Sequence, residues 1–449
     1  MSFTYIDLFA GIGGFHLALD SLGGQAVFAS EIDPAARSIY EHNFGSATYG
    51  AIAGDIIPLT EPKVDRVILP HDILVGGFPC QPFSKSGFQR GINETRGTLF
   101  YNIARILEKR KPRVVVLENV RNLIGPNHRH TWTLIRRTLR DLGYRTPEEP
   151  TVFSPHLLSG DHLGRPQVRE RVFIVGVYVG RDEAWKWTED TRLAINRPVK
   201  GWDPKRWDLQ ASVLQDNAEV INLDRYHLSD VEIDIVNMWD DFLSCVGSPA
   251  GRRLPGFPLW ADYFTARPEY DLDWADWKVD FVEKNSAFYR SHTKEISSWR
   301  KRHGSLKHVN DSRRKLEWQA QDMTSIWDGL IQFRPSGLRI KKPTYVPALV
   351  AMNQTSVFGP RKRRLTVREG ARLQGFPDSF TFGEQVDAKS FKQLGNAVSV
   401  GVVTQILSQA AYLWDFFPPD IAESIRKSRG QMGLPDEPLV FEDDIEALW

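Results

Sequence analysis

Residues 5–15 read YIDLFAGIGGF, and this stretch decides the fold. The apolar run 5–9 leads directly into glycines at positions 11, 13 and 14, where a strand turns into a helix. Glycine accepts the backbone conformations of a tight turn and lets a ligand approach the main chain, while the start of a helix offers free N–H groups. The stretch therefore predicts a strand, a ligand-binding turn and a helix, which open an α/β sheet.

Glu31 follows Gly11 by 20 residues, at the end of the next apolar run, where a carboxylate can accept hydrogen bonds from both hydroxyls of a ribose. The third glycine of the turn directly follows the second, unlike the pyrophosphate-binding fingerprint. A ligand with a ribose but no pyrophosphate fits this spacing better, and S-adenosylmethionine is one such ligand. Asp55, at the following strand end, could bind the adenine amino group. A purely structural turn and a nicotinamide site are the alternatives.

Short apolar runs alternate with amphipathic stretches up to about residue 180, which is the pattern of an α/β domain. The expected strands are 5–9, 25–30, 73–75, 114–117 and 172–179, and the expected helices include 98–109 and 131–142. Polar or reactive residues follow three of these strands. Because open α/β sheets bind ligands at the carboxyl ends of their strands, we expect the site at that edge.

The composition is that of a globular protein with balanced charge. The 449 residues include 57 Lys and Arg and 56 Asp and Glu, for a net charge of +1, and 41% are hydrophobic. This length predicts two or three domains. The two cysteines, Cys80 and Cys245, exclude a disulfide framework and a cysteine-based zinc site. With no signal peptide and no run of about 20 apolar residues, we expect a cytosolic protein with no membrane partner and no metal.

Beyond about residue 180 the pattern changes, and tryptophan and charged residues become frequent up to about residue 343. Residues 299–318 interleave basic and aromatic residues, and a second basic tract lies within 334–364. A near-zero net charge does not exclude nucleic acid, because binding depends on where the basic groups lie. The segment 391–414 continues as an apolar helix, and the acidic tail beyond Pro418 is expected to be peripheral.

Cys80 is the candidate nucleophile. It lies in GGFPCQPFS (76–84), between two prolines, after an apolar strand and before a polar loop. A free cysteine is usually a small buried hydrophobic residue, and we assign that role to Cys245. The neighbours of Cys80 favour a nucleophile instead, although its thiol needs the folded site or the substrate to favour the thiolate.

Two further motifs carry charged residues at strand ends. Glu118 directly follows the strand 114–117, where a carboxyl group can act as a general acid or as a binding group; the alternative is a helix cap or a solvated side chain. In QVRER (167–171), alternation along a strand would place Arg169 and Arg171 on one face. Two guanidinium groups on one face suggest an anionic or carbonyl-rich ligand, with structural ion pairing as the alternative.

Four motifs in this order, Phe-x-Gly-x-Gly-Gly, Pro-Cys-Gln, Glu-Asn-Val and Gln-x-Arg-x-Arg, resemble the DNA (cytosine-5) methyltransferase family. RLTVRE (364–369) with RLQGFP (372–377) is similar to the ninth conserved block of that family, and GNAVS (395–399) to the tenth. The resemblance covers about 5–180 and 360–414. The short segment before the first motif resembles the bacterial members, which are often partnered with restriction endonucleases.

The resemblance implies a catalytic role for each motif. The Cys80 thiolate would add to C6 of cytosine and make C5 electron-rich enough to accept a methyl group. Glu118 would protonate N3 or share its proton, and Arg171, supported by Arg169, would stabilise charge at O2. The target base must first rotate out of the duplex.

The resemblance also implies a site for S-adenosylmethionine. Phe9 would stack on the adenine, Glu31 would hold the ribose, and Asp55 with Ile56 would frame the base. Ile32 stands where some relatives carry a tryptophan that covers the adenine, so π overlap is lost there. The remaining pocket residues would be Gly11, Gly13, Pro79, Leu99 and Asn396.

Two regions are expected to contact DNA. The loop 80–97 resembles the mobile catalytic loop of the family and carries Ser84, Ser86 and Arg96. The middle of the chain occupies the place of the target recognition domain, whose expected DNA contacts are Arg300, Arg302, Arg339 and Lys341.

The resemblance implies a Rossmann-like class I methyltransferase fold, a mixed sheet with helices on both faces, plus a smaller, irregular target recognition domain. We expect a cofactor-binding catalytic domain at 1–180, the recognition domain and hinge at 181–385, a segment returning to the catalytic domain at 386–416, and an acidic tail at 417–449. The expected partners are double-stranded DNA and, acting separately, a cognate endonuclease; the enzyme is expected to be a monomer in the bacterial cytoplasm. An RNA cytosine-5 methyltransferase and a non-catalytic DNA-binding regulator are the alternatives; an oxidoreductase would leave Pro79-Cys80-Gln81 unexplained.

Overall fold

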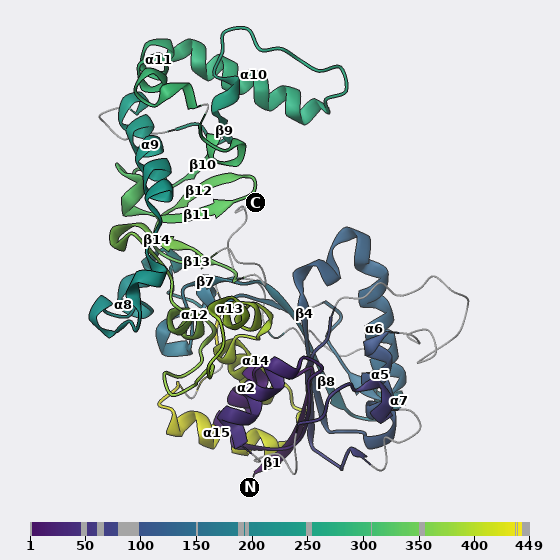
Figure 1. The fold of residues 1–449 in the computed structure, drawn as a ribbon. Helices are drawn as coiled ribbons and strands as arrows, with labels where there is room; N and C mark the ends of the chain where they lie inside the picture. Colours follow the sequence, from purple (N-terminus) through teal and green to yellow (C-terminus); the bar gives the residue numbers. More distant parts are fainter. Residues whose placement is uncertain are drawn as a thin grey trace. The chain divides into compact units, whose positions relative to one another are not determined.

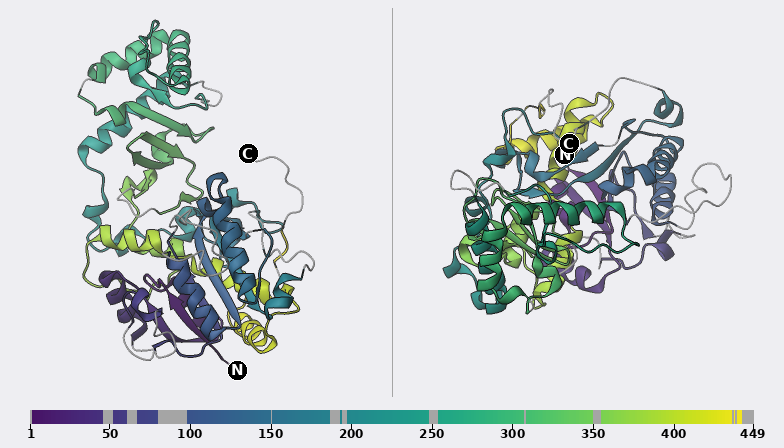
Figure 2. Two further views of the ribbon diagram at one scale, coloured as in Figure 1. Left: turned by 90° about the vertical axis from the view of Figure 1, so that its right-hand side faces the viewer. Right: turned by 90° about the horizontal axis from the view of Figure 1, so that it is seen from above.

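The computed structural model divides the chain into two compact units (Figures 1 and 2). The first unit comprises Met1–Trp207, Pro347–Met352 and Gly370–Trp449, and the second comprises Asp208–Val346 and Asn353–Glu369. The structure describes residues 2–45, 52–60, 67–79, 98–149, 151–186, 193, 197–247, 254–306, 308–349, 355–435, 437 and 439–441. Among these residues, no helix is both long and apolar enough to cross a bilayer.

A mixed sheet of seven strands forms the centre of the first unit, in the order β2-β1-β3-β4-β8-β5, with β6 paired to β8. Strands β1 to β4 run parallel, and β8 runs antiparallel to β4. Their bounds are β1 (Phe3–Leu8), β2 (Gly24–Ser30), β3 (Ile73–Gly77), β4 (Val114–Val120), β5 (Tyr144–Arg145), β6 (Thr151–Phe153) and β8 (Arg171–Tyr178). All five expected strands are present, and the prediction of a mixed α/β sheet is confirmed.

The pairing of the strands places the strand-end residues of the sequence motifs at one edge of this sheet. Leu8 at the end of β1 pairs with Ser30 of β2 on one side and with Gly76 of β3 on the other. Gly77 of β3 pairs with Glu118 of β4. The carboxyl ends of four parallel strands and the first residue of β8 therefore lie along the same edge.

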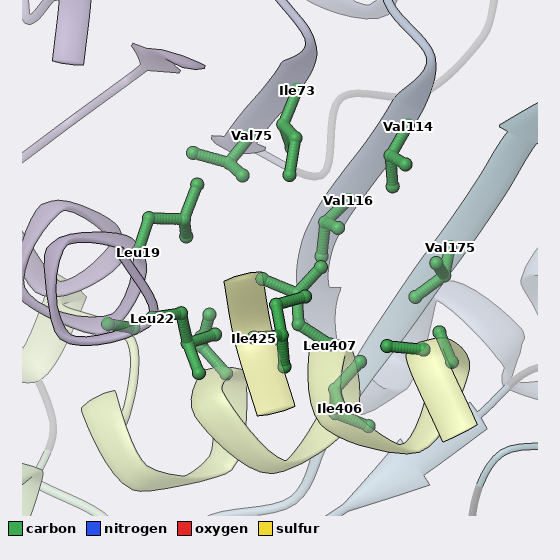
Figure 3. Close-up of a cluster of buried hydrophobic side chains, with 14 of the residues drawn as sticks. Leu19, Leu22, Ile73, Val75, Val114, Val116, Val175, Ile406, Leu407 and Ile425 are labelled. Carbon is green, nitrogen blue, oxygen red and sulfur yellow. The ribbon is translucent and has the colours of Figure 1, made fainter. Parts of the chain in front are cut away.

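Helices cover both faces of this sheet because its strands carry apolar residues on both sides. On one face, the strand residues pack with α1 (Gly14–Ser21), α14 (Val400–Leu413) and α15 (Pro419–Gln431), as Figure 3 shows for Ile73, Val75, Val114 and Val116. The other face packs with α5 (Leu99–Arg110) and α6 (Arg129–Asp141). The remaining helices of this unit are α2 (Pro34–Phe44), α3 (Ile57–Thr60), α7 (Arg181–Trp185) and α13 (Asp387–Asn396).

The expectation of a peripheral C-terminal tail is wrong for α15. Ile421 and Ile425 are fully or almost fully buried and join the core cluster that contains β1, β3 and β4. Their spacing of four residues places both on one side of the helix, so the acidic residues of this segment face elsewhere.

The second unit has its own six-stranded sheet and core, in the order β15-β14-β11-β12-β10-β9. Helices α9 and α11 contribute Val236, Trp239 and Trp299 to an apolar cluster with one face of this sheet. Its elements are α8 (Leu209–Ser212), α9 (Asp230–Val246), β9 (Leu259–Trp260), α10 (Asp276–Ser291), α11 (Thr293–Arg302), β10 (Lys315–Gln319), β11 (Leu330–Arg334), β12 (Gly337–Lys341), β14 (Val357–Phe358) and β15 (Arg363–Arg364). Helix α12 (Val367–Gln374) spans the boundary at Glu369, where the chain returns from the second unit to the first.

The boundaries between the two units differ from the domain boundaries expected at residues 180 and 385. Residues up to Trp207 belong to the first unit because Val199 is buried in its core and donates its N–H to the carbonyl of Leu157. The indole N–H groups of Trp202 and Trp207 both donate to the carbonyl of His156. These contacts join positions far apart in the sequence, which local composition does not reveal.

Candidate active site

The glycine turn joins β1 to α1 in left-handed backbone conformations. Phe9, Gly11 and Gly13 have φ angles of 56°, 55° and 89°. Such angles cost glycine little, whereas an aromatic residue rarely adopts them, so the position of Phe9 is a strained one held by its surroundings. The N–H of Ala10 donates to the carbonyl of Ser30 at 2.9 Å, which ties the turn to the end of β2.

Glu31 closes this turn from the next strand. Its Oε2 accepts a hydrogen bond from the Gly11 N–H at 2.8 Å, and its Oε1 accepts one from the Asp33 N–H at 2.8 Å. Arg37 donates from Nη1 to the carbonyls of Glu31 and Ile32, at 2.8 and 3.1 Å. The predicted proximity of Gly11 and Glu31 is thus present, and the carboxylate is held at the carboxyl edge of the sheet.

The other expected cofactor residues differ in accessibility. Ile32 is 68% exposed, and Asp55, Pro79 and Asn396 are also exposed. Asp55 lies two residues beyond Ala53, whose bridge to Ser30 extends the strand edge. Ile56 is buried in the core, and Leu99 at the start of α5 packs against the same cluster. Ile56 therefore packs in the core and does not present a free surface to a ligand.

Cys80, Ser84, Ser86 and Arg96 lie outside the described residues. The chain leading to Cys80 is described up to Pro79, directly after β3. The side chain of Asn119 donates from Nδ2 to the carbonyl of Phe78 at 2.8 Å, and both residues are buried. The end of β4 therefore holds the segment that enters Cys80. The sequence analysis gave Asn119 no role, although its place next to Glu118 in a strand-end motif was the available signal.

Glu118 and Arg171 form a pair at the centre of the sheet edge. The Arg171 Nε lies 3.0 Å from Glu118 Oε1, and Glu118 is only 8% exposed. Gly77, opposite Glu118, leaves room for the carboxylate, since a Cβ at that position would lie 3.3 Å from Glu118 Oε2. Burial raises the pKa of Glu118, although the positive charges of Arg171 and Arg169 oppose this effect. The carboxyl group can therefore hold a proton at a higher pH than an exposed glutamate.

Arg169 has different partners from Arg171. It is 3% exposed and donates from Nη1 to the carbonyl of Leu349 at 3.1 Å, and from Nη2 to those of Gly395 and Ala397 at 2.8 and 2.7 Å. Burial lowers the pKa of Arg169 to about 9, so its guanidinium remains protonated at neutral pH. Strand alternation does not relate the two arginines, because β7 (Gln167–Val168) ends before Arg169 and β8 begins at Arg171. Arg169 instead holds the turn on both sides of Asn396.

Asp7 is a buried polar residue that the sequence analysis did not single out. It lies inside β1, is fully buried, and neither of its carboxylate oxygens makes a well-formed hydrogen bond within the described part of the chain. Burial and the nearby charge of Glu31 raise its pKa well above the ordinary value. An aspartate inside an otherwise apolar strand was the signal for this position.

The expected DNA contacts in the second unit separate into two groups. Arg300 donates to the carbonyls of Phe264, at 2.8 Å, and Ala261, and Arg302 donates to Asp241 Oδ2 at 2.8 Å and to Ser298 and Cys245. These two arginines are engaged within the unit, and the Arg302 side chain remains 45% exposed, so contact of either residue with DNA stays a prediction. Arg339 and Lys341 lie on strand β12 and are half-buried, and Arg339 pairs with Glu317.

The mixed sheet and its glycine turn are consistent with a Rossmann-like methyltransferase fold, and the comparisons give the family. The chain matches the family described as C-5 cytosine-specific DNA methylase over residues 3–411. It is 42% identical over 480 residues to the Type II methyltransferase M.AluI of Cellulosimicrobium cellulans, covering 91% of each chain. It is 32% identical over 445 residues to the Type II methyltransferase M.HgiCI of Herpetosiphon aurantiacus, covering 90% of this chain and 96% of that one.

A solved structure of DNMT2 from Spodoptera frugiperda matches 91% of this chain and 99% of its own at 18% identity, with a TM-score of 0.47. A likeness this low leaves the assignment to the family match and the sequence relatives. The chain belongs to the C-5 cytosine-specific DNA methylase family, as its motifs predicted, and it is a DNA cytosine-C5 methyltransferase.

Proposed function

We propose that this enzyme transfers a methyl group from S-adenosylmethionine to C5 of a cytosine that is rotated out of a specific double-stranded DNA sequence, through a covalent bond between Cys80 and C6. The observation that carries this proposal is the buried Glu118–Arg171 pair, 3.0 Å apart, at the strand edge where the chain enters Cys80. A polarised carboxyl group and a guanidinium at one point suit the N3 and O2 edge of cytosine.

The residues at the glycine turn fit S-adenosylmethionine. A Cβ on Gly11 would meet nothing within 4 Å, so the turn leaves open space beside the Glu31 carboxylate. Glu31 would exchange its bond to the main chain for ribose hydroxyls, and exposed Ile32, Asp55, Pro79 and Asn396 would border the adenine and the methionine part. When bound, S-adenosylmethionine supplies an electrophilic methyl group.

Three side chains of this protein would act on the target cytosine. The Cys80 thiolate forms a bond to C6, and the electrons of the C5–C6 double bond move into the ring while Glu118 gives its proton to N3. Arg171, which already faces Glu118, donates to O2 and stabilises the remaining charge. C5 can now accept the methyl group.

Release reverses the addition. The C5 proton passes to water, the C6–sulfur bond breaks, and Cys80 leaves as a thiolate while the N3 proton returns to Glu118. Arg169 acts as a positioning residue in this scheme, because its donors hold the carbonyls of Gly395 and Ala397 next to Asn396. It does not contact the base.

The proposed partners follow from the reaction. Ser84, Ser86 and Arg96 would contact the duplex around the flipped base, and Arg339 and Lys341 would contact it from the second unit. The enzyme would act as a monomer in the bacterial cytoplasm, with a cognate endonuclease cutting unmethylated copies of the same sequence separately.

The proposal is tested by incubating the full chain with radiolabelled S-adenosylmethionine and mixed-sequence duplex DNA, followed by bisulfite sequencing. We expect label in DNA with the wild type, none with Cys80→Ala, and full incorporation with the matched control Cys245→Ala. A duplex with 5-fluorocytosine at the identified position should form an adduct that survives denaturation, because fluorine cannot leave as the C5 proton does. Methyl transfer that persists in Cys80→Ala, or no adduct at a verified site, would contradict the covalent step.

A further inference from the structure

The sheet of the second unit has one face whose central side chains are polar. On strands β10, β11 and β12, alternate residues such as Leu316, Ile331 and Ile340 belong to the apolar cluster that includes α9 and α11. Between them, Leu330 and Gly337 are buried, and the central residues are polar and half-buried or exposed. We call this side the open face, and its residues are Glu317, Gln319, Gln332, Arg334, Arg339 and Lys341.

A single carboxylate organises this open face. Glu317 Oε2 lies 2.8 Å from Arg339 Nε and accepts from Arg334 Nη1 at 3.1 Å, while its Oε1 accepts from Gln319 Nε2 at 2.5 Å. Side-chain exposure is 25% for Glu317 and Arg339 and 30% for Arg334. With Lys341 nearby, three cations surround one anion, so the face keeps an excess of positive charge. Burial and the neighbouring arginines lower the pKa of Lys341, as that excess predicts.

Two side chains at the centre of the open face have unused hydrogen-bonding groups. Within the described part of the chain, the terminal nitrogens of Arg339 make no hydrogen bond, because only its Nε is paired, with Glu317. Gln332 lies directly opposite Arg339 in the antiparallel pairing of β11 with β12. Its Oε1 is buried without a partner among the described residues, and its Nε2 makes only a long contact of 3.5 Å to Ser356 Oγ.

These groups match base edges better than phosphates. A guanidinium with two unpaired terminal nitrogens fits O6 and N7 of guanine. A phosphate would be repelled by Glu317, which lies within hydrogen-bonding distance of Arg339, whereas an uncharged base edge would not.

We propose that the open face reads the DNA sequence, with Arg339 binding a guanine and Glu317 acting as the positioning residue that orients Arg339. This inference rests on the proposed action on a specific duplex sequence. It assigns the specificity of the second unit to its sheet face rather than to the basic helix α11.

The test first selects the preferred duplex from a random-sequence pool by binding to the full chain, and then measures binding to that duplex and to the same duplex with each base pair replaced in turn. Arg339→Lys keeps the charge but loses the two-nitrogen fork. It should remove discrimination at one G·C pair, by roughly ten- to a hundredfold, and leave the other positions and the salt dependence unchanged. Glu317→Gln should weaken discrimination at the same pair, and the double variant should lose no more than Arg339→Lys alone. Lys342→Ala, a matched exposed cation paired with Asp322 at 3.4 Å, is the control.

Two outcomes would overturn the inference. Uniform weakening on all sequences with a smaller salt slope would mean a phosphate contact. Unchanged discrimination in Arg339→Lys would mean that Arg339 reads no base. Unfolding temperatures of all variants show whether folding is intact, and Glu317→Gln tests the same base pair if Arg339→Lys does not fold. Binding needs no methyl donor, so wild-type binding without any methyl transfer would instead contradict the proposed function.

Discussion

The two sheets of this enzyme place their charged residues in different ways. In the first unit, helices cover both faces, and the site charges of Glu31, Glu118 and Arg171 stand at the strand ends. In the second unit, one face is covered, and Glu317 and Arg339 project from the middle of the other. A sheet buried on both sides can present polar groups to a ligand only at its edge, whereas a sheet covered on one side can present a row of them. The first arrangement suits a small ligand in a crevice and the second an extended surface.

The largest expected effect tests the strand-end charges. Glu118→Gln removes the proton donor but keeps the shape, so the methyl-transfer rate should fall by roughly 100- to 10,000-fold, the usual contribution of general acid catalysis. Affinity for the target duplex should change little, because the open face is untouched. Single-turnover transfer and equilibrium binding measure the two quantities. An equal loss of methyl-transfer rate and of duplex affinity would contradict the assignment of catalysis to the first sheet and of DNA reading to the second.

Glu118→Gln should also change the pH dependence of the methyl-transfer rate. Because burial raises the pKa of Glu118, the wild-type rate should fall at high pH as this carboxyl group loses its proton. It should also fall at low pH as Cys80 becomes a neutral thiol. Glu118→Gln should keep only the low-pH fall, at a reduced rate. A high-pH fall that persists in Glu118→Gln would assign that limb to another group.

Another prediction concerns a buried ion pair in the second unit. Arg363 and Glu369 are both fully buried and joined by two hydrogen bonds of 2.7 and 2.9 Å. Arg363→Met would leave the Glu369 carboxylate buried without its counter-ion and should destabilise the second unit by about 3–5 kcal/mol. Urea unfolding followed by tryptophan fluorescence measures this change, and Arg363→Met with Glu369→Leu should recover part of it. Full stability of the single variant would contradict the importance of this pair.

Variants of Arg169 test whether this buried residue supports cofactor binding without contacting the base. Arg169→Met leaves three carbonyls without their donor and should cost about 2–3 kcal/mol of stability. Because the Asn396 turn loosens, KM for S-adenosylmethionine should rise more than kcat falls, and Arg169→Lys should restore part of the affinity. A loss confined to kcat would instead indicate contact with the reacting base.

The smallest effect is expected at Arg302, a cation on α11 rather than on the open face. Its guanidinium is held by Asp241 and Cys245, so Arg302→Ala should leave target affinity and discrimination unchanged in the binding assay. A clear loss of affinity would extend the DNA-binding surface from the sheet to the helix.

Much of the fold could be predicted because the central strands are buried on both faces and therefore read as continuous apolar runs. The runs 73–75 and 114–117, within β3 and β4, are of this kind. Other parts gave no local signal. Strands β9, β14 and β15 have two residues each, too few for any periodicity, and the acidic composition of the tail concealed the buried Ile421 and Ile425.

The candidate active site, too, could be predicted only in part from the sequence. Glu31, Glu118 and Arg171 stand next to strand ends, so their proximity followed from the order of strands. The partners of Arg169 lie 180, 226 and 228 residues further along the chain, and no local pattern could have separated it from Arg171. The engagement of Arg300 by carbonyls was equally hidden, because a basic run looks alike whether its donors are free or used.

Helix α14 has a consequence for how this polypeptide is made. Its residues Val403, Ile406 and Leu407 fill the interior beside β1 and β3, yet they leave the ribosome some 400 residues after the first strand. Until then, of the helices that cover this hydrophobic side, the nascent sheet has α1 alone, while the second unit can already collapse around its own core. Contacts between such distant segments slow folding and prolong exposure to aggregation. Synthesis that stops before α14 should yield material that chaperones retain, with only the inserted unit resistant to protease.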